Sequence, residues 1–301
     1  MAKVFCIDVS RCSGCYNCQF ACKDEHCNNE WLPIAKQQPL TGQFWLKLEE
    51  HVEGSRPKIR IHYIPVLCNH CEHPACMEAA PDAVYRREDG LVIIDPIKAA
   101  GHKELADACP YGAIYWNEAL QIPQKCTGCA HLLDNGFDQP RCVEACPTEA
   151  LKFLDLDEVT DELEGTVTMK PEEGTKPNVH YRNIPGRFIG GLVYDPVNKE
   201  VVIGAKCRLL TGGRRREAVT DLFGDFWFED LPSGSHDLYI EAEGYAQKKI
   251  EGIRTAEGVS VNLGDISLER EEKKPITADE WEKIKEKLQT GSVETEVHED
   301  F

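Results

Sequence analysis

The cysteines of this chain are its most constraining feature, because twelve of the fifteen fall into four short runs before residue 147. Run one is Cys12-x2-Cys15-x2-Cys18-x3-Cys22, and run two is Cys68-x2-Cys71-x4-Cys76. Run three keeps a single Cys109-Pro110 pair, and run four is Cys126-x2-Cys129-x12-Cys142-x3-Cys146-Pro147. In such runs three thiolates bind one [4Fe–4S] cluster, and the fourth cysteine ligates the cluster of a partner run.

This ligand exchange between runs predicts three complete sites. Run one pairs with run four to give two sites, and run two pairs with run three to give one. The predicted ligands are Cys12, Cys15, Cys18 and Cys146 for site 1; Cys22, Cys126, Cys129 and Cys142 for site 2; and Cys68, Cys71, Cys76 and Cys109 for site 3. We therefore expect three [4Fe–4S] clusters and no other cofactor in this chain.

A fourth site has lost all four of its ligands. The positions that would supply them hold Ala80, Ala99, His102 and Leu105. Scattered cysteines would not lose the ligands of one site and no others, so the pattern indicates an erased cluster. We expect His102, with Ala99 and Leu105, to help fill the vacated space.

Three cysteines remain outside the sites. Cys6 and Cys207 lie in strand-like segments, where a free cysteine behaves as a small buried apolar residue. Cys27 lies near run one and is interpreted as a spare thiol, with a ligand role left open. Histidines and aromatic residues near the runs are expected to pack or to form hydrogen bonds, because each site already has four thiolates: His70, His73, His131, Trp31, Trp45, Tyr111, Tyr115 and Trp116.

Net charge and hydropathy exclude other classes of protein. A net charge of −18 over 301 residues disfavours nucleic acid as a partner, since phosphate binding needs clustered Lys and Arg. No apolar stretch is long enough to span a membrane, and the N-terminus lacks an apolar signal region. The predicted location is cytoplasmic, with export alongside a signal-bearing partner left open.

The chain divides into four segments of different composition. Residues 1–154 are predicted to form tandem ferredoxin-like modules, and residues 155–186 an extended linker. Residues 187–268 hold short alternating strands separated by Gly, Asp, Asn and Pro, which is typical of a β-sandwich. Residues 269–301 form an acidic tail, with a short helix expected at 275–290. The predicted fold class is α+β.

Within the first segment, the pattern predicts a strand over 1–10 and two strands within an insertion at 28–66. Residues 83–96 are predicted to form a hairpin, with Asp89 and Gly90 at its turn. Residues 96–109 are predicted to form a helix, and residues 113–117 another strand. These expectations repeat around each cysteine run.

The chain shows no catalytic apparatus. Nucleotide-binding loops, a Ser-His-Asp order and a flavin signature are all missing from the sequence. Clusters held entirely by thiolates move single electrons, so we expect an electron carrier. Two alternatives stay open: a free polyferredoxin-type carrier, and a structural zinc protein, since C-x2-C pairs also bind zinc.

The sequence resembles the iron–sulfur subunits of the dimethyl sulfoxide reductase family of molybdopterin oxidoreductases. The segments that carry the resemblance are IDVSRCSGCYNCQFACKDEHCNNEW, YIPVLCNHCEHPAC, CPYGAIYWNEALQIPQKCTGCAHLLD and GTKPNVHYRNIPGRF. Within this family it is most similar to small subunits of the pyrogallol–phloroglucinol transhydroxylase type. The segment FGDFWFEDLPSGSHDLYIEAEGYAQKKI is similar to the transthyretin-like, carboxypeptidase regulatory-like sandwich.

The resemblance implies a heterodimer with a large catalytic subunit that holds molybdenum or tungsten on two pterin guanine dinucleotides. It implies electron transfer to a reaction on polyhydroxylated aromatics, by transhydroxylation or by reductive catechol dehydroxylation, with a soluble electron donor as a further partner. Another reductase of the same family is the alternative. For the sandwich, we expect a docking or stabilising role in preference to carbohydrate binding.

Overall fold

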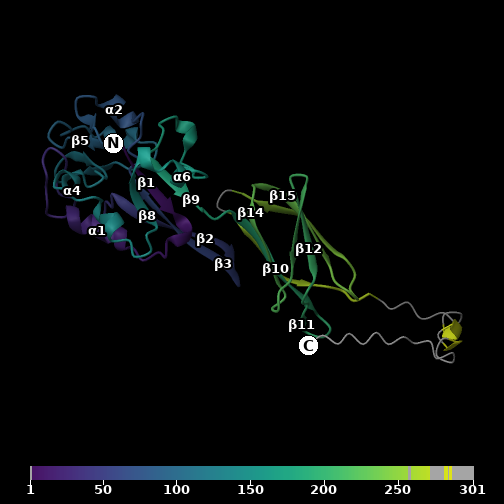
Figure 1. The fold of residues 1–301 in the computed structure, drawn as a ribbon. Coiled ribbons are helices and arrows are strands. Elements are labelled where there is room, and N and C mark those ends of the chain that lie inside the picture. The colour runs from purple at the N-terminus through teal and green to yellow at the C-terminus, as the bar shows by residue number, and fades with distance from the viewer. Residues whose placement is uncertain (1, 257–258, 272–280, 284, 287–301) are drawn as a thin grey trace. The chain divides into compact units, whose positions relative to one another are not determined.

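The computed structural model describes residues 2–256, 259–271, 281–283 and 285–286 (Figure 1). Contacts divide the chain into two compact units. Unit 1 contains residues 1–190, 228–235 and 254–264, and unit 2 contains residues 191–227, 236–253 and 265–301. The helix predicted at 275–290 lies mostly outside the described residues, although residues 281–283 and 285–286 are helical.

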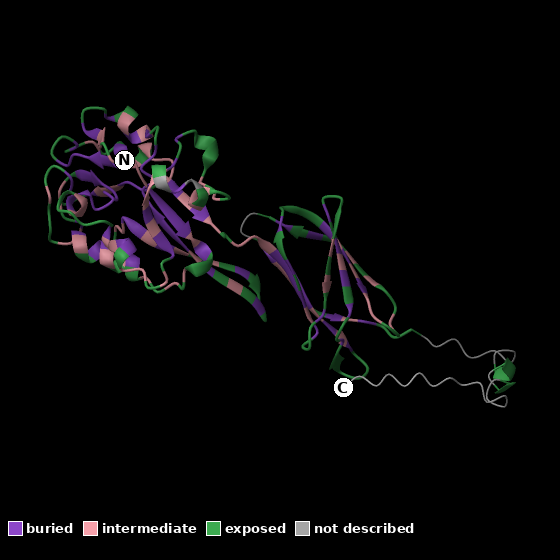
Figure 2. Ribbon diagram, viewed as in Figure 1, coloured by how far each residue is buried: buried purple, intermediate pink, exposed green. Residues whose placement is uncertain are grey.

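Unit 1 is built around a three-stranded sheet in the order β8-β1-β9. The N-terminal strand β1 (Lys3–Asp8) pairs antiparallel with β8 (Leu151–Asp155) and parallel with β9 (Val179–Arg182). Apolar residues of these strands are buried, and Figure 2 colours much of their ribbon as buried. The sheet joins the start of the chain to segments about 150 residues later, which brings run one beside run four.

Short hairpins and helices surround this sheet, and the predicted strands of the insertion are confirmed. The hairpins are β2 (Leu46–Ser55) with β3 (Lys58–Leu67), β4 (Val84–Arg86) with β5 (Val92–Ile94), and β6 (Tyr115–Asn117) with β7 (Ile122–Gln124). The helices of the cysteine runs are η1 (Val9–Arg11), α1 (Asn17–His26), α2 (Ala75–Ala79), α3 (Leu105–Ala108), α4 (Ala130–Asp134) and α5 (Arg141–Glu144).

The prediction of a helix over residues 96–109 is wrong for most of this segment, because only α3 is helical. Asp95 Oδ1 accepts hydrogen bonds from the backbone N–H groups of Ile97 (2.9 Å) and Lys98 (3.2 Å), which fixes a turn. Gly101 then adopts a left-handed φ of +86°, and its N–H donates to the Gln121 carbonyl at 2.9 Å. A left-handed residue cannot continue a right-handed helix, so the segment remains a series of turns until α3.

The segment 155–186 is not extended throughout. It contains η2 (Leu156–Glu158), α6 (Thr160–Leu163), η3 (Pro171–Glu173) and the strand β9. Tyr181 of β9 is 1% exposed, and its hydroxyl donates to the Pro65 carbonyl at 3.0 Å. This segment is therefore part of unit 1, where one of its strands completes the central sheet.

The strands predicted after residue 187 are confirmed. Two four-stranded sheets form, one from β10, β11, β14 and β17 and the other in the order β13-β12-β15-β16. Their bounds are β10 Arg187–Asp195, β11 Glu200–Val201, β12 Lys206–Thr211, β13 Arg214–Val219, β14 Asp225–Leu231, β15 Gly234–Glu241, β16 Lys248–Thr255 and β17 Val261–Ser267.

A buried carboxylate fixes one end of these strands. Asp195 accepts hydrogen bonds from Arg270 Nη2 (2.7 Å), the Tyr245 hydroxyl (3.0 Å) and the Val197 N–H (2.8 Å). Burial alone would raise the pKa of Asp195, but these bonds outweigh it and lower the pKa to about 2. The carboxylate is consequently charged at neutral pH.

Candidate metal centre

Site 1 lies where the polypeptide leaves β1 and where it leaves α5. Cys12 follows η1, and Cys18 is buried in the first turn of α1. Burial raises the pKa of the Cys18 thiol to about 12, and the neighbouring thiols of Cys12 and Cys146 add to the shift. Cys15 is exposed and interacts electrostatically with Cys12. The four predicted ligands of site 1 are thus neighbours, at the solvent-facing edge of unit 1.

The Cys146 thiol differs from the others of site 1. Burial alone would raise its pKa, but hydrogen bonds from the backbone around residues 148–151 outweigh burial and lower it. The Ala150 N–H, for example, donates to Cys146 Sγ at 3.2 Å. Backbone donors of this kind stabilise a thiolate ligand.

Site 2 is entirely interior. Its four cysteines are all buried, and they come from α1, from the loop after β7, from the start of α4 and from α5. Burial raises the pKa of Cys22 well above its usual value, and the nearby thiols of Cys126 and Cys129 raise it further. Burial also raises the pKa of Cys142 well above its usual value, and the nearby thiols of Cys129 and Cys22 raise it further. The four predicted ligands are therefore mutual neighbours.

A left-handed turn shapes the loop of site 2. Gly128 has φ +63°, and its N–H donates to Cys126 Sγ at 3.4 Å. A Cβ added at Gly128 would lie 2.7 Å from Leu91 Cδ2, a separation that real Cβ atoms essentially never show. Glycine is needed here both for the backbone conformation and for the close approach of Leu91.

Site 3 is a cavity that the four predicted ligands line together. Its walls are formed by Cys68, Cys71, Cys76 and Cys109, with Asn69, His70, Pro74, Ala75, Val92, Pro110, Tyr111, Ile114, Lys125 and Thr175. Burial raises the pKa of both Cys71 and Cys76 to about 11, and repulsion from neighbouring thiols contributes. Cys109 is half-buried, so site 3 also approaches the surface.

Predicted ligands of different sites lie near one another. Cys126 of site 2 interacts electrostatically with Cys68 of site 3, and Cys142 of site 2 with Cys18 of site 1. Site 2 therefore neighbours both of the other sites. The four cysteines of site 2 are buried, whereas sites 1 and 3 each include a cysteine that is exposed or half-buried.

The erased fourth site is packed with apolar side chains. Ala80 (5% exposed), Ala99 (0%) and Leu105 (0%) belong to one buried cluster with Cys76 and Ile114. The expectation for His102 is wrong, because its side chain is 43% exposed and its Nδ1 lies 2.7 Å from Glu104 Oε1, within hydrogen-bond distance. Leucine and alanine fill the space. The polar imidazole turns toward solvent, where water can satisfy its hydrogen bonds without the free-energy cost of burial.

Two of the three histidines near the runs, His70 and His131, form side-chain hydrogen bonds, as expected. His70 is buried, and its Nδ1 accepts from the Val92 N–H at 3.0 Å. His131 Nε2 contacts Glu25 Oε1 at 3.0 Å, and its ring stacks on Trp31 at 3.7 Å. The side chain of His73 is exposed, with its backbone N–H bonded to Thr175.

The remaining cysteines and aromatic residues pack within the protein, and Tyr111 also lines the site 3 cavity. Cys6 and Cys207 are buried in β1 and β12, as expected. Cys27 ends α1 and lies 3.7 Å from the Pro39 carbonyl. Four of the five aromatic residues pack against one core as expected, with Trp45 buried and Trp31, Tyr111 and Tyr115 half-buried. Trp116 is half-buried, and the Lys103 ammonium lies 5.8 Å from the centroid of its ring.

Two residues near the sites were missed by sequence reasoning. Lys125 is 3% exposed, and its ammonium donates to the carbonyls of Val92 and, at 3.0 Å, Cys126. Burial alone would lower the pKa of Lys125, but the surrounding thiols outweigh it and raise the pKa. Thr175 lies beside Cys71, and its hydroxyl is 2.5 Å from that of Tyr111. A lysine directly before a ligand cysteine was a signal that could have been noticed.

The residues present fit iron–sulfur clusters. Buried thiols crowd together with backbone N–H donors aimed at sulfur, and cluster iron would neutralise the thiolates that burial otherwise disfavours. Within the described residues, no three Cys, His, Asp or Glu side chains lie close enough to hold one metal ion. A cubane cluster is larger than one ion, so its ligands lie further apart.

Two family profiles match this chain, one in the cysteine-rich segment and one in the sandwich. The profile of the 4Fe-4S dicluster domain matches residues 59–156. The profile of the carboxypeptidase regulatory-like domain matches residues 189–269, which confirms the predicted kind of sandwich. In the part of the protein that the structure describes, no helix has the length and apolar character needed to cross a membrane.

Curated relatives extend the match along the sequence. The pyrogallol hydroxytransferase small subunit of Pelobacter acidigallici is 40% identical over 277 residues, covering 87% of this chain and 97% of that protein. One component of the anaerobic dimethyl sulfoxide reductase of Escherichia coli is 35% identical over 179 residues, covering 58% and 85%. One component of the tetrathionate reductase of Salmonella typhimurium is 32% identical over 196 residues, covering 62% and 74%.

Proposed function

Because this chain is a member of the family of iron–sulfur subunits of dimethyl sulfoxide reductase-type oxidoreductases, we propose that it is the electron-transfer subunit of a molybdenum or tungsten enzyme. Its reaction would be performed on polyhydroxylated aromatics in a large catalytic partner. This chain contributes cysteine sites and no catalytic residue. When bound, [4Fe–4S] clusters supply one-electron redox chemistry.

The difference in exposure between the three sites carries this proposal. Site 2 is buried on all sides, whereas sites 1 and 3 each include a cysteine that is exposed or half-buried. A structural metal site needs no such ends, but an electron conduit needs an entry, an exit and an insulated middle. The coupling of Cys68 to Cys126, and of Cys18 to Cys142, supports short steps between neighbouring sites.

The ligand sets are part of the proposal and can be tested one site at a time. Cys109→Ser should remove or convert the cluster of site 3 alone, because Cys109 interacts with Cys68 and lines only that cavity among the sites. Iron should fall from about twelve toward about eight atoms per chain. Cys207→Ser, at a buried cysteine of β12, is the matched control and should keep all the iron. Three intact clusters in Cys109→Ser would refute the assignment.

The partner can be identified by anaerobic purification from the native host. Iron, zinc, molybdenum and tungsten would be measured together with the copurifying proteins. About twelve irons and a stoichiometric large subunit with molybdenum or tungsten are expected. Iron without a partner would favour the free electron carrier, and zinc in place of iron would overturn the proposal.

The substrate class follows from the relative that matches over most of both sequences, whose name refers to pyrogallol. A hydroxyl transfer between two polyphenols needs no net electrons, whereas reductive removal of a catechol hydroxyl needs two per turnover. Assays of the purified complex with trihydroxybenzenes and catechols, with and without a reductant, separate the two. Turnover of dimethyl sulfoxide or tetrathionate instead would point to another reductase of the family.

A further inference from the structure

The buried Lys125 lies between site 2 and site 3. It is the last residue before Cys126, directly after β7, and it also lines the site 3 cavity. It shares the lining of that cavity with Cys68 and Cys76 of site 3, and its ammonium donates to the carbonyl of Cys126 of site 2 at 3.0 Å. One side chain thus faces predicted ligands of two different clusters.

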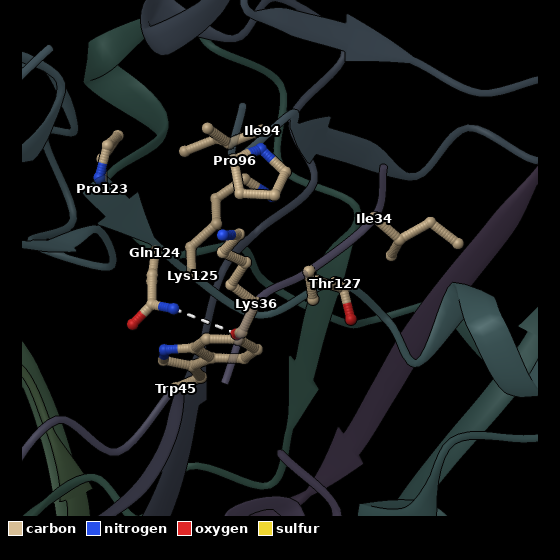
Figure 3. A pocket seen from close by; sticks show the side chains of 10 residues that line it. Ile34, Lys36, Trp45, Ile94, Pro96, Pro123, Gln124, Lys125 and Thr127 are labelled. Atoms are coloured by element: carbon tan, nitrogen blue, oxygen red, sulfur yellow. Dashed lines mark hydrogen bonds between the residues drawn. The ribbon is translucent and has the colours of Figure 1, made fainter. Parts of the chain in front are cut away.

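The surroundings of Lys125 hold the ammonium in place without neutralising it. Two backbone carbonyls, of Val92 and Cys126, accept its hydrogen bonds. Among the residues that the structure describes, no carboxylate forms an ion pair with it. Behind it lies a second small cavity, whose lining includes Trp45, Pro96 and Thr127 and no acidic residue (Figure 3).

A cation in such a place has a specific electrostatic consequence. Each reduction adds one negative charge to a cluster, and a nearby buried positive charge stabilises that reduced form. The interaction is strong because little water separates the charges in the interior. An uncharged side chain of similar size would fill the same space but would not stabilise the reduced cluster. The effect therefore depends on the charge of Lys125.

We propose that Lys125 is a positioning residue for electron transfer, whose fixed charge raises the reduction potentials of the clusters at sites 2 and 3 together. This rests on the proposed function, since it requires clusters at both sites. No predicted ligand of site 1 is among the cysteines that surround Lys125, so site 1 should be largely insensitive. The consequence is that electrons pass between sites 2 and 3 through two clusters of raised potential.

The test compares Lys125→Met and Lys125→Gln with the wild type in a dithionite titration of the holoprotein, followed by electron paramagnetic resonance. Both variants should reduce the equilibrium constant for one-electron reduction at sites 2 and 3 at least tenfold, which is about 59 mV for one electron. Site 1 should change less than about twofold. Lys103→Met is the control, because that side chain is 65% exposed and its charge is screened.

The two variants separate charge from hydrogen bonding. Glutamine keeps donors for the Val92 and Cys126 carbonyls but carries no charge. Unchanged potentials in either variant with all clusters present, or loss of a cluster from both, would overturn the proposal. A wild-type protein without clusters would instead refute the proposed function, so the two failures are distinguishable by iron analysis.

Discussion

Gly128 offers a sharp test of how the site 2 loop is built. Gly128→Ala combines two costs. A left-handed alanine costs about 1–2 kcal/mol, and the new Cβ would lie 2.7 and 2.8 Å from the two methyl groups of Leu91. Overpacking of this kind costs about 1–3 kcal/mol more. Gly136→Ala is the matched control, because its φ is +84° and its Cβ would meet nothing within 4 Å.

The assay is the rate at which an iron chelator removes iron from the anaerobic holoprotein. If the clash is relieved by shifting the loop between Cys126 and Cys129, site 2 opens more readily. Since each 1.4 kcal/mol is tenfold, Gly128→Ala should release iron about 5- to 150-fold faster than Gly136→Ala. Equal rates in the two variants would show that Leu91 yields without cost, and the reasoning would be refuted.

Three further changes test the packing around the sites and the sandwich. Leu105→Ala, in the erased site, should destabilise the segment 96–109 by about 2–5 kcal/mol in hydrogen exchange, whereas Leu40→Ala, at a residue 69% exposed, should cost little. Tyr181→Phe leaves the Pro65 carbonyl unsatisfied and should cost β9 about 1–3 kcal/mol in the same measurement. Asp195 has a folded pKa of about 2, below its usual value, so the stability it gives is complete above about pH 4 and is lost as the pH falls through 2. Pepsin should therefore cleave the sandwich of Asp195→Asn faster than that of the wild type at pH 4, with the two rates converging at pH 2; a constant ratio would contradict this.

The erased site shows how far a spacing pattern reaches. Counting positions identified Ala80, Ala99, His102 and Leu105 as one group, and three of them are buried together. His102 departs from the group because a spacing rule gives a position along the sequence but not the direction of a side chain. The prediction over 96–109 failed for a related reason. The apolar residues there resembled a helix, while Asp95 and the left-handed Gly101 impose turns through local hydrogen bonds.

The sequence by itself determined the sandwich and predicted the cluster type and the three ligand sets, because strand alternation and thiolate spacing are local properties of a polypeptide. Only the tertiary structure decided which sites are neighbours, the burial of site 2 and the place of Lys125. These depend on segments far apart in sequence: β1 pairs with β8 and β9, and Thr175 reaches Cys71 from outside every cysteine run. Long-range packing is therefore what brings the three separate ligand sets next to one another.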